Sequence, residues 1–384
     1  MPRTAGFDKI RSYNPASMPT FHYVNPSLIH WGAGCVREKL DGELRRLGAS
    51  RVFLVTTRSA IEDPALSPAV EALLGDRLAG RFAGIGQHAP ARSVMEAADA
   101  ARAARAGVLV SLGGGSPIDA TKAVAFALAS GLDLTLPDAP ARARGAKLSG
   151  VLPHLAIPTT LSVAELASSA GFSAEGTHEK IGVAAPELLP AAVFYDAGLA
   201  LRTPLPLWLS TGIRAVDHAA ETLLAPGEHP LADAAAVEGL RRLRSALPAV
   251  RARPADAAAR TDCQLGAWFS YLLPGPAAKG LSHTLGKRLG SRHGIPHGVT
   301  SCLLLPHVLR YLAPRAPRTM ERIAQALGAP TAAEGVDRLV AQLDLPRHLA
   351  PYGLSDEDLK EAARAVASAE HSEADLVGLL RAAT

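Results

Sequence analysis

The sequence has little of what marks several classes of protein. Its 384 residues include only three cysteines, which stand far apart at Cys35, Cys263 and Cys302. They form neither a CxxC pair nor a disulfide framework, so we expect a protein of the reducing cytoplasm. No segment approaches the ~20 uninterrupted apolar residues that a membrane span needs. The first residues carry charge but no apolar core, so we expect no secretory signal.

A large excess of one charge is also missing. Lys and Arg number 40 against 36 Asp and Glu, and aromatic residues make up only 4%. The sequence pI is near 9.0, but the basic residues are scattered among acidic ones, which does not predict a nucleic-acid partner. What is present is 48% hydrophobic residues, in a chain long enough for two domains of roughly 100–200 residues each. We expect a globular protein with a large core.

Short apolar runs alternate with Ala-rich amphipathic stretches along the first half of the chain. Strands are expected at 51–56, 81–84, 107–112 and 154–157, and helices at 68–78 and 93–106. This alternation predicts a parallel sheet covered by helices. The segment 137–150 is expected to be an exposed loop.

The pattern changes after about residue 195. Strand-like runs stop, and long helices are expected at 211–224, 230–246, 255–272 and 317–327. The sequence therefore predicts an N-terminal α/β domain at residues 1–198 and an all-α domain at residues 199–384.

A glycine turn, LGGGSPID at 112–119, is the sharpest local feature. Its missing Cβ atoms let the backbone approach a ligand closely. We expect Ser116 to cap the following helix and Asp119 to complete a capping box. The N-terminus of such a helix binds phosphate readily. The turn is not a GxGxxG motif, because Ile118 replaces the third glycine; the alternative is an ordinary turn that only caps a helix.

Two further groups carry polar chemistry. Thr159 and Thr160 directly follow an expected strand, at the sheet edge where ligands of α/β folds bind; the alternative is a turn-forming pair. His218, His283 and His297 lie in the helical half. Three imidazoles are enough for a metal site, although such widely spaced histidines are often incidental.

Together these segments resemble the iron-containing alcohol dehydrogenase family, within the dehydroquinate-synthase-like superfamily. The matching pieces are GGGSPIDATKA at 113–123, AIPTT at 156–160, GIRAVDHAAE at 212–221 and GLSHTLGKRLGSRHGIPHG at 280–298. They occur in the family's order, and residues 180–248 most resemble the maleylacetate reductase branch. The resemblance implies an NAD(P)-binding α/β domain, a helical domain and an active site in the cleft between them.

The resemblance also implies which residues bind the cofactor. Gly113, Gly114, Gly115 and Ser116 would hold the pyrophosphate, and Thr159 and Thr160 would lie along the cofactor. Asp119 belongs to the same predicted site. Many relatives carry an acidic ribose-binding residue where this chain has Thr57. Because Thr57 has no carboxylate that would repel a 2′-phosphate, NADPH is as plausible a cofactor as NADH.

Metal-dependent relatives bind iron or zinc through one Asp and three His. His218, His283 and His297 match the three histidines, but the Asp position is Arg214. Relatives often carry a further histidine four residues after the second ligand, and this chain has Lys287 at that position. At i,i+4 spacing each cation faces its neighbouring histidine. Since like charges repel a divalent ion, we predict no catalytic metal, as the branch resemblance also implies.

The leading hypothesis is an NAD(P)H-dependent reductase of a small carboxylate-bearing oxo or unsaturated compound. The resemblance points to maleylacetate, reduced to 3-oxoadipate in aromatic catabolism. Arg214 and Lys287 would stabilise enolate charge or bind carboxylates, and one of the three histidines would deliver a proton. The alternative for Arg214 is a structural ion pair with Asp217 or Glu221.

Two rival functions remain open. One is a metal-dependent alcohol or aldehyde dehydrogenase that uses only the three histidines. The other is the same scaffold recruited to non-redox chemistry or binding, because Val163 replaces a glycine near the expected nicotinamide position. The expected partners are a small anionic substrate and a second copy of the chain, as family members are commonly dimers or larger.

Overall fold

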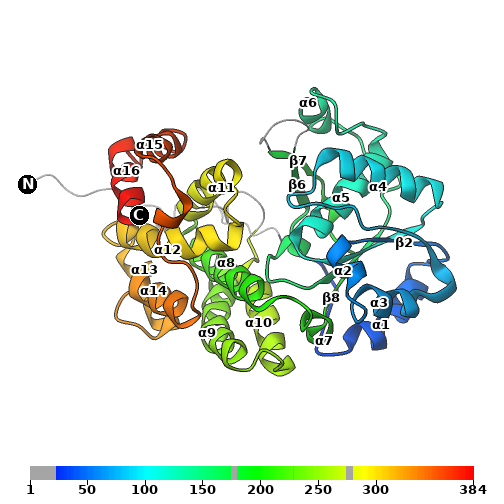
Figure 1. Ribbon diagram of the computed structural model, residues 1–384, viewed down its shortest axis with the longest axis horizontal. Helices are drawn as coiled ribbons and strands as arrows, with labels where there is room; N and C mark the ends of the chain where they lie inside the picture. The colour runs from blue at the N-terminus through cyan, green and yellow to red at the C-terminus, as the bar shows by residue number, and fades with distance from the viewer. Residues whose placement is uncertain (1–22, 174–179, 228, 274–279) are drawn as a thin grey trace, which may run out of the picture. The chain divides into compact units, whose positions relative to one another are not determined.

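The structure is a computed structural model that describes residues 23–173, 180–227, 229–273 and 280–384. The chain divides into two compact units, which can be followed by colour in Figure 1. The first contains Val24–Pro204 and Ala255–Gln264, and the second contains Leu205–Pro254 and Leu265–Thr384. The predicted fold class, a parallel α/β part followed by an all-α part, is confirmed. The roles predicted for residues 1–198 and 199–384 stay predictions.

The first unit is built on a six-stranded sheet in the order β1-β8-β5-β4-β2-β3, with every neighbouring pair parallel. Its strands are β1 (Ile29–Trp31), β2 (Val52–Val55), β3 (Leu78–Phe82), β4 (Val108–Gly113), β5 (His154–Pro158) and β8 (Ala192–Tyr195). Fully buried, mainly apolar runs form β2, β4 and β5, where strands are expected. Parallel strands of this kind are covered on both faces.

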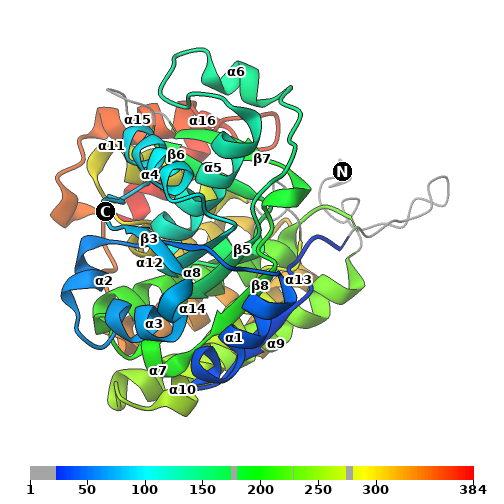
Figure 2. The same ribbon diagram turned by 90° about the vertical axis from the view of Figure 1, so that its right-hand side faces the viewer.

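Helices cover both faces of this sheet (Figure 2). On one face lie α1 (Cys35–Arg46), α2 (Arg58–Glu62) and α3 (Ser67–Leu74), and on the other lie α4 (Ala91–Ala103) and α5 (Gly115–Ser130). Successive strand residues point to opposite faces. Phe53 therefore packs into the core under α4 and α5, and Leu54 packs into the core under α1 and α3.

Several local predictions for this unit are wrong. The expected loop at 137–150 contains a short helix, α6 (Ala139–Ala143). The α-helix expected at 68–78 ends at Leu74, because Gly75 adopts a positive φ of 53°; a short 3-10 helix over Gly75–Arg77 then leads into β3. An antiparallel pair that was not predicted, β6 (Ser169–Ser173) with β7 (Lys180–Ala184), also belongs to this unit.

The second unit is helical throughout its described residues. Its helices are α8 (Leu205–Leu224), α9 (Pro230–Ala252), α11 (Leu281–His293), α12 (His297–Leu312), α13 (Pro317–Leu327), α14 (Ala332–Gln342), α15 (Asp356–Arg364) and α16 (Glu373–Ala382). A further helix, α10 (Ala257–Ser270), begins in the first unit and ends in the second. Helix α12 approaches α8 closely, because a Cβ on Gly298 would lie 2.7 Å from the carbonyl of Ser210. Glycine at this position thus brings α12 against α8.

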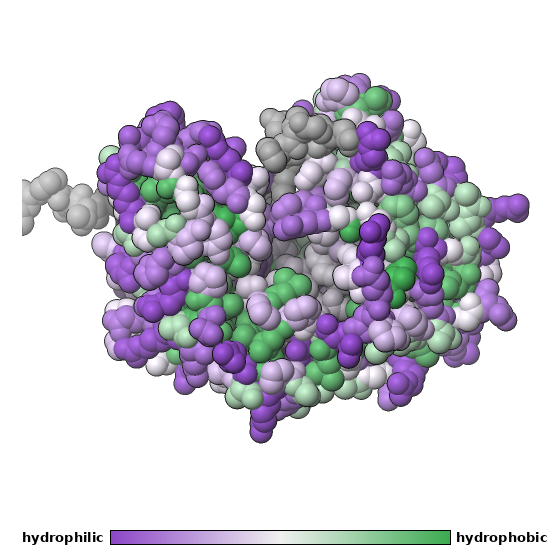
Figure 3. All heavy atoms as spheres, in the orientation of Figure 1, coloured by the Kyte–Doolittle hydropathy of each residue, from purple (hydrophilic) through white to green (hydrophobic). Residues whose placement is uncertain are grey.

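The surface over α15 is hydrophilic (Figure 3). Both signs of charge occur there, since Asp356 lies 2.9 Å from Lys360 and 2.7 Å from Arg381. Such mixed surfaces lack the single-sign field that attracts polyanions. Within the described ranges, no helix has the length and apolar character needed to cross a membrane.

Candidate active site

The predicted cofactor residues meet at one edge of the parallel sheet. Strand β2 leads into α2 and α3 on one face, whereas its neighbour β4 leads into α5 on the other. In open α/β sheets, ligands bind outside the carboxyl ends of the strands where the chain diverges in this way. Thr57 follows β2, Gly113 ends β4 and leads through Gly114 into α5, and Thr159 and Thr160 follow β5, the other neighbour of β4. The structure therefore brings these residues together.

The glycine turn is packed tightly against the segment that follows β5. Gly113 has a φ of +139°, and a Cβ there would lie 2.8 Å from Cγ of Pro117. A Cβ on Gly114 would lie 3.2 Å from Cγ2 of Thr160, and one on Gly115 would lie 3.1 Å from Oγ of Ser162. The glycines at 114 and 115 thus permit a close approach of two chain segments.

The expected capping box is wrong, because α5 begins two residues earlier than predicted. Gly114 is the N-cap, and no side chain caps the helix. Ser116 Oγ instead accepts a hydrogen bond from the backbone N–H of His88 at 3.2 Å. Asp119 lies 2.8 Å from Nζ of Lys122 and accepts a hydrogen bond from Gly171 N at 3.4 Å.

The uncapped end of α5 fits a phosphate group. Thr160 Oγ1 and Ser162 Oγ are buried beside the glycine turn, and neither has a hydrogen-bond partner among the described residues. Buried hydroxyls without partners are costly, and the N-terminus of a long helix attracts anions. Thr57 is already engaged, since its Oγ1 accepts from Ala60 N at 3.3 Å and so caps α2.

The segment after Thr160 is fixed by buried polar contacts. Val163 has a φ of +58°, a conformation that a β-branched residue rarely adopts. The ammonium of Lys122, whose side chain is fully buried, donates to the carbonyls of Ala164 at 2.9 Å and Ala167 at 3.3 Å. Tyr195 donates its hydroxyl to Glu165 at 2.8 Å, and burial raises the pKa of Glu165 to about 7. These contacts hold the strained turn in place.

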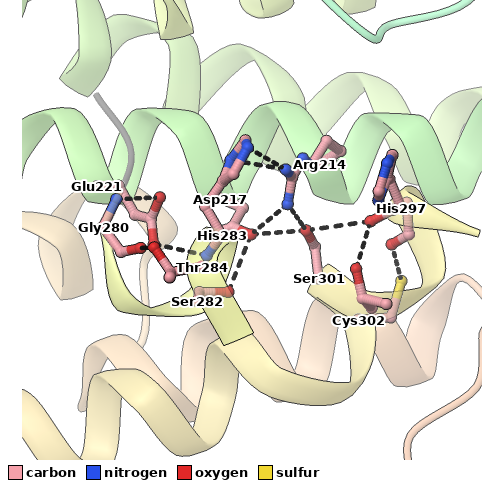
Figure 4. A network of polar contacts seen from close by, with 12 residues as sticks. Arg214, Asp217, Glu221, Gly280, Ser282, His283, Thr284, His297, Ser301 and Cys302 are labelled. Atoms are coloured by element: carbon pink, nitrogen blue, oxygen red, sulfur yellow. Dashed lines mark hydrogen bonds and ion pairs between the residues drawn. The ribbon is translucent and has the colours of Figure 1, made fainter. Parts of the chain in front are cut away.

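A second cluster lies where α8, α11 and α12 meet (Figure 4). Arg214, on α8, is 7% exposed. Its Nη2 lies 2.6 Å from Nδ1 and 2.8 Å from Nε2 of His283 on α11. Its Nη1 lies 3.0 Å from Oγ of Ser301 and 3.3 Å from Oδ2 of Asp217. The ion pair considered as the alternative for Arg214 is thus found, and its partner is Asp217.

Glu221, one turn further along α8, holds the start of α11. Its carboxylate accepts from Gly280 N at 2.8 Å and from His283 N at 3.0 Å. Burial, and then the nearby charge of Asp217, raise the pKa of Glu221 to about 8. The contact places His283 relative to α8 through its backbone.

Two of the three predicted histidines, His218 and His283, lie side by side. The ring of His218 lies 5.4 Å from that of His283 and 5.0 Å from that of Tyr271, centroid to centroid. His297 begins α12. In the part of the chain that the structure describes, no three His, Cys, Asp or Glu side chains form a group able to hold a metal. Because a guanidinium also lies against His283, the residues present do not fit the iron that the resemblance to the family would suggest.

Lys287 does not join this cluster. It is exposed on α11, and no described residue forms an ion pair or side-chain hydrogen bond with it. Of the two predicted cations, only Arg214 contacts a predicted histidine.

Sequence reasoning overlooked Ser282, Ser301 and Lys122 as polar centres of these two clusters. Ser301 is 87 residues from Arg214, so no local spacing connects them. Lys122 stands three residues after Asp119 on α5, and that spacing would have been the available signal.

Comparison with known proteins is consistent with this architecture. The chain matches the iron-containing alcohol dehydrogenase family model over residues 26–197 and the C-terminal model of the Fe-containing alcohol dehydrogenase family over residues 208–377. It is 34% identical to a maleylacetate reductase of Rhizobium sp. strain MTP-10005 over 341 residues, 89% of each chain. It is also 34% identical to a maleylacetate reductase of Burkholderia cepacia over 335 residues, 87% of each chain. The crystal structure of a maleylacetate reductase from Agrobacterium tumefaciens superposes with a TM-score of 0.80 at 32% identity, covering 95% of this chain and 98% of that one.

Proposed function

Because this chain belongs to the iron-containing alcohol dehydrogenase family, we propose that it is an oxidoreductase that reduces maleylacetate with a nicotinamide cofactor and without a metal. Relatives named maleylacetate reductase, 34% identical over nearly nine-tenths of the chain, support the substrate. The proposal that the reaction needs no metal rests on the contact between Arg214 Nη2 and His283 Nδ1 at 2.6 Å.

The reduced cofactor supplies a hydride when it is bound. The N-terminus of α5, with the hydroxyls of Thr160 and Ser162, would hold its phosphates. Thr57 provides no carboxylate to repel a 2′-phosphate, so both NADH and NADPH are candidates. Asp119 and Lys122 would act indirectly, because they bind each other and Lys122 also binds the loop after Thr160.

Arg214 would take the charge that develops on the substrate. Hydride addition to an alkene carbon conjugated with a ketone leaves an enolate, and a preorganised cation stabilises that charge. The described partners of Arg214 engage Nη1 and Nη2 only. Its Nε–H is therefore left to donate to an enolate or carboxylate oxygen.

A histidine would return the proton that completes the reduction. His283 accepts a hydrogen bond from the guanidinium of Arg214, which requires a neutral imidazole. It would therefore lie, in its neutral form, beside the group that binds the enolate. His218, whose ring lies against both His283 and Tyr271, is our candidate for the general acid. His297 and Lys287 stay secondary candidates, and Lys287 would attract anionic substrate from the surface.

Loss of absorbance of NADH or NADPH on addition of maleylacetate to the purified protein tests the proposal. We expect steady consumption that depends on maleylacetate and exceeds the rate with simple aldehydes. Oxidation of alcohols without reduction of maleylacetate would overturn the substrate assignment. Failure to bind either dinucleotide in calorimetry would instead favour a non-redox role. A homodimer in the cytoplasm stays our expectation, and light scattering tests the dimer.

A further inference from the structure

Three helices of the second unit are joined at one carboxylate oxygen. Oδ2 of Asp217 on α8 accepts from Ser301 Oγ of α12 at 2.6 Å and from Ser282 Oγ of α11 at 2.9 Å. The same oxygen lies 3.3 Å from Nη1 of Arg214. Asp217 is only 1% exposed, and Figure 4 shows the carboxylate between the two serines and the guanidinium.

The direction of the hydrogen bonds makes Ser301 a relay between Asp217 and Arg214. A serine hydroxyl has a single proton and two lone pairs. Because Ser301 gives its proton to Asp217 at 2.6 Å, its lone pairs are left to accept from Nη1 of Arg214 at 3.0 Å. The carboxylate thereby fixes which way the hydroxyl points.

A guanidinium is planar and rigid, so fixing one nitrogen fixes the others. With Nη1 held by Ser301 and Asp217, Nη2 lies against the ring of His283. No described contact joins the carboxylate of Asp217 to that ring. We infer that Asp217 is a positioning residue that aims the guanidinium of Arg214 at His283, both by its own contact with Nη1 and through the shorter contacts of Ser301. Its effect on turnover rests on the proposed function.

Ser282 provides a matched control. Both serines donate to the same oxygen of Asp217, and each is 1% exposed. Only Ser301 also contacts Arg214. Replacing Asp217 itself would leave a buried guanidinium without its counter-charge and risks unfolding, so the serines separate positioning from stability more cleanly.

The test compares Ser301→Ala, Ser301→Thr and Ser282→Ala. Hydrogen bonds to charged groups contribute roughly 1.5–3 kcal/mol, so we expect kcat for maleylacetate to fall about tenfold or more in S301A. We expect S282A to lose less than about threefold at a similar loss of Tm, and S301T, which keeps the hydroxyl, to recover most of the rate. Equal losses of kcat in S301A and S282A would overturn the inference.

Crystal structures of the same variants give a readout that does not need turnover. We expect the Arg214–His283 contact to be lost in S301A and retained in S282A. A guanidinium that stays on His283 in S301A would also overturn the inference. If the unaltered protein does not reduce maleylacetate, the proposed function fails, whereas these structures still decide whether Ser301 and Asp217 position Arg214.

Discussion

Nη2 of Arg214 lies 2.6 Å from Nδ1 and 2.8 Å from Nε2 of His283. A neutral imidazole has one nitrogen that accepts and one that donates, so the guanidinium finds an acceptor whichever tautomer is present. A metal ion would need that same lone pair. Under the proposed function, the hydrogen bond from Arg214 would take the place of a metal–ligand bond at His283.

Replacing Arg214 is expected to reduce the chemical step most. Removing a charge-stabilising donor costs about 10²–10³ in kcat, so we expect a loss of that size in Arg214→Ala. Arg214→Lys keeps the charge without the planar fork, so its kcat should lie between that of the unaltered protein and that of Arg214→Ala. Steady-state kinetics with maleylacetate, with circular dichroism as the folding control, measure this.

Lys287→Ala separates the two predicted cations. Lys287 is exposed, so its removal should raise KM by a small factor that shrinks with added salt, because exposed charges are screened. The assignment of the main role to Arg214 is contradicted if K287A loses more kcat than R214A.

Glu165 should make stability depend on pH. Burial raises its pKa from 4.5 to about 7 in the folded chain. Between these values the folded state binds more protons than the unfolded state, so stability falls as pH rises from 4.5 to 7. Glu165→Gln should reduce this slope of Tm against pH. Glu62→Gln, at an exposed position, is the control and should leave the slope unchanged; an unchanged slope in E165Q would refute the prediction.

Val163→Gly should be unusually mild for a buried valine. Val163 is 3% exposed with a φ of +58°. Losing the side chain costs about 1.5–3 kcal/mol, but releasing the left-handed conformation returns roughly 1–2 kcal/mol. Val110→Gly, in fully buried β4, releases no such backbone strain and should show the full loss of stability. We expect denaturant unfolding to place V163G at least about 1 kcal/mol above V110G in stability; the opposite order would contradict the strain.

Local patterns predicted the main elements but not their exact ends. Strands such as β2 and β4 follow from short buried runs of Val and Leu, and α13 spans the predicted residues 317–327. The start of α5 depends on how Gly114 packs against Thr160, 46 residues away along the chain. A local capping pattern gives no information about such a distant contact. The β6–β7 pair includes Gly171 and Gly182, which weaken a strand signal.

The candidate site was predictable in its residue types more than in its contacts. Arg214 and His283 were identified as a cation and a histidine that resemblance places near a metal position. Their contact depends on Asp217 and Ser301, which are 84 residues apart and meet only because α8 and α12 pack together. Lys287 shares a helix with His283, yet it is exposed, since one turn of helix does not fix which way a long side chain extends.

The most direct test of metal-independent reduction is the rate of maleylacetate-dependent cofactor oxidation before and after exhaustive chelation, with metal content measured on the same samples. We predict an unchanged rate in protein that holds far less than one metal ion per chain. A rate that is lost on chelation and restored by iron or zinc would contradict the replacement of the metal by Arg214.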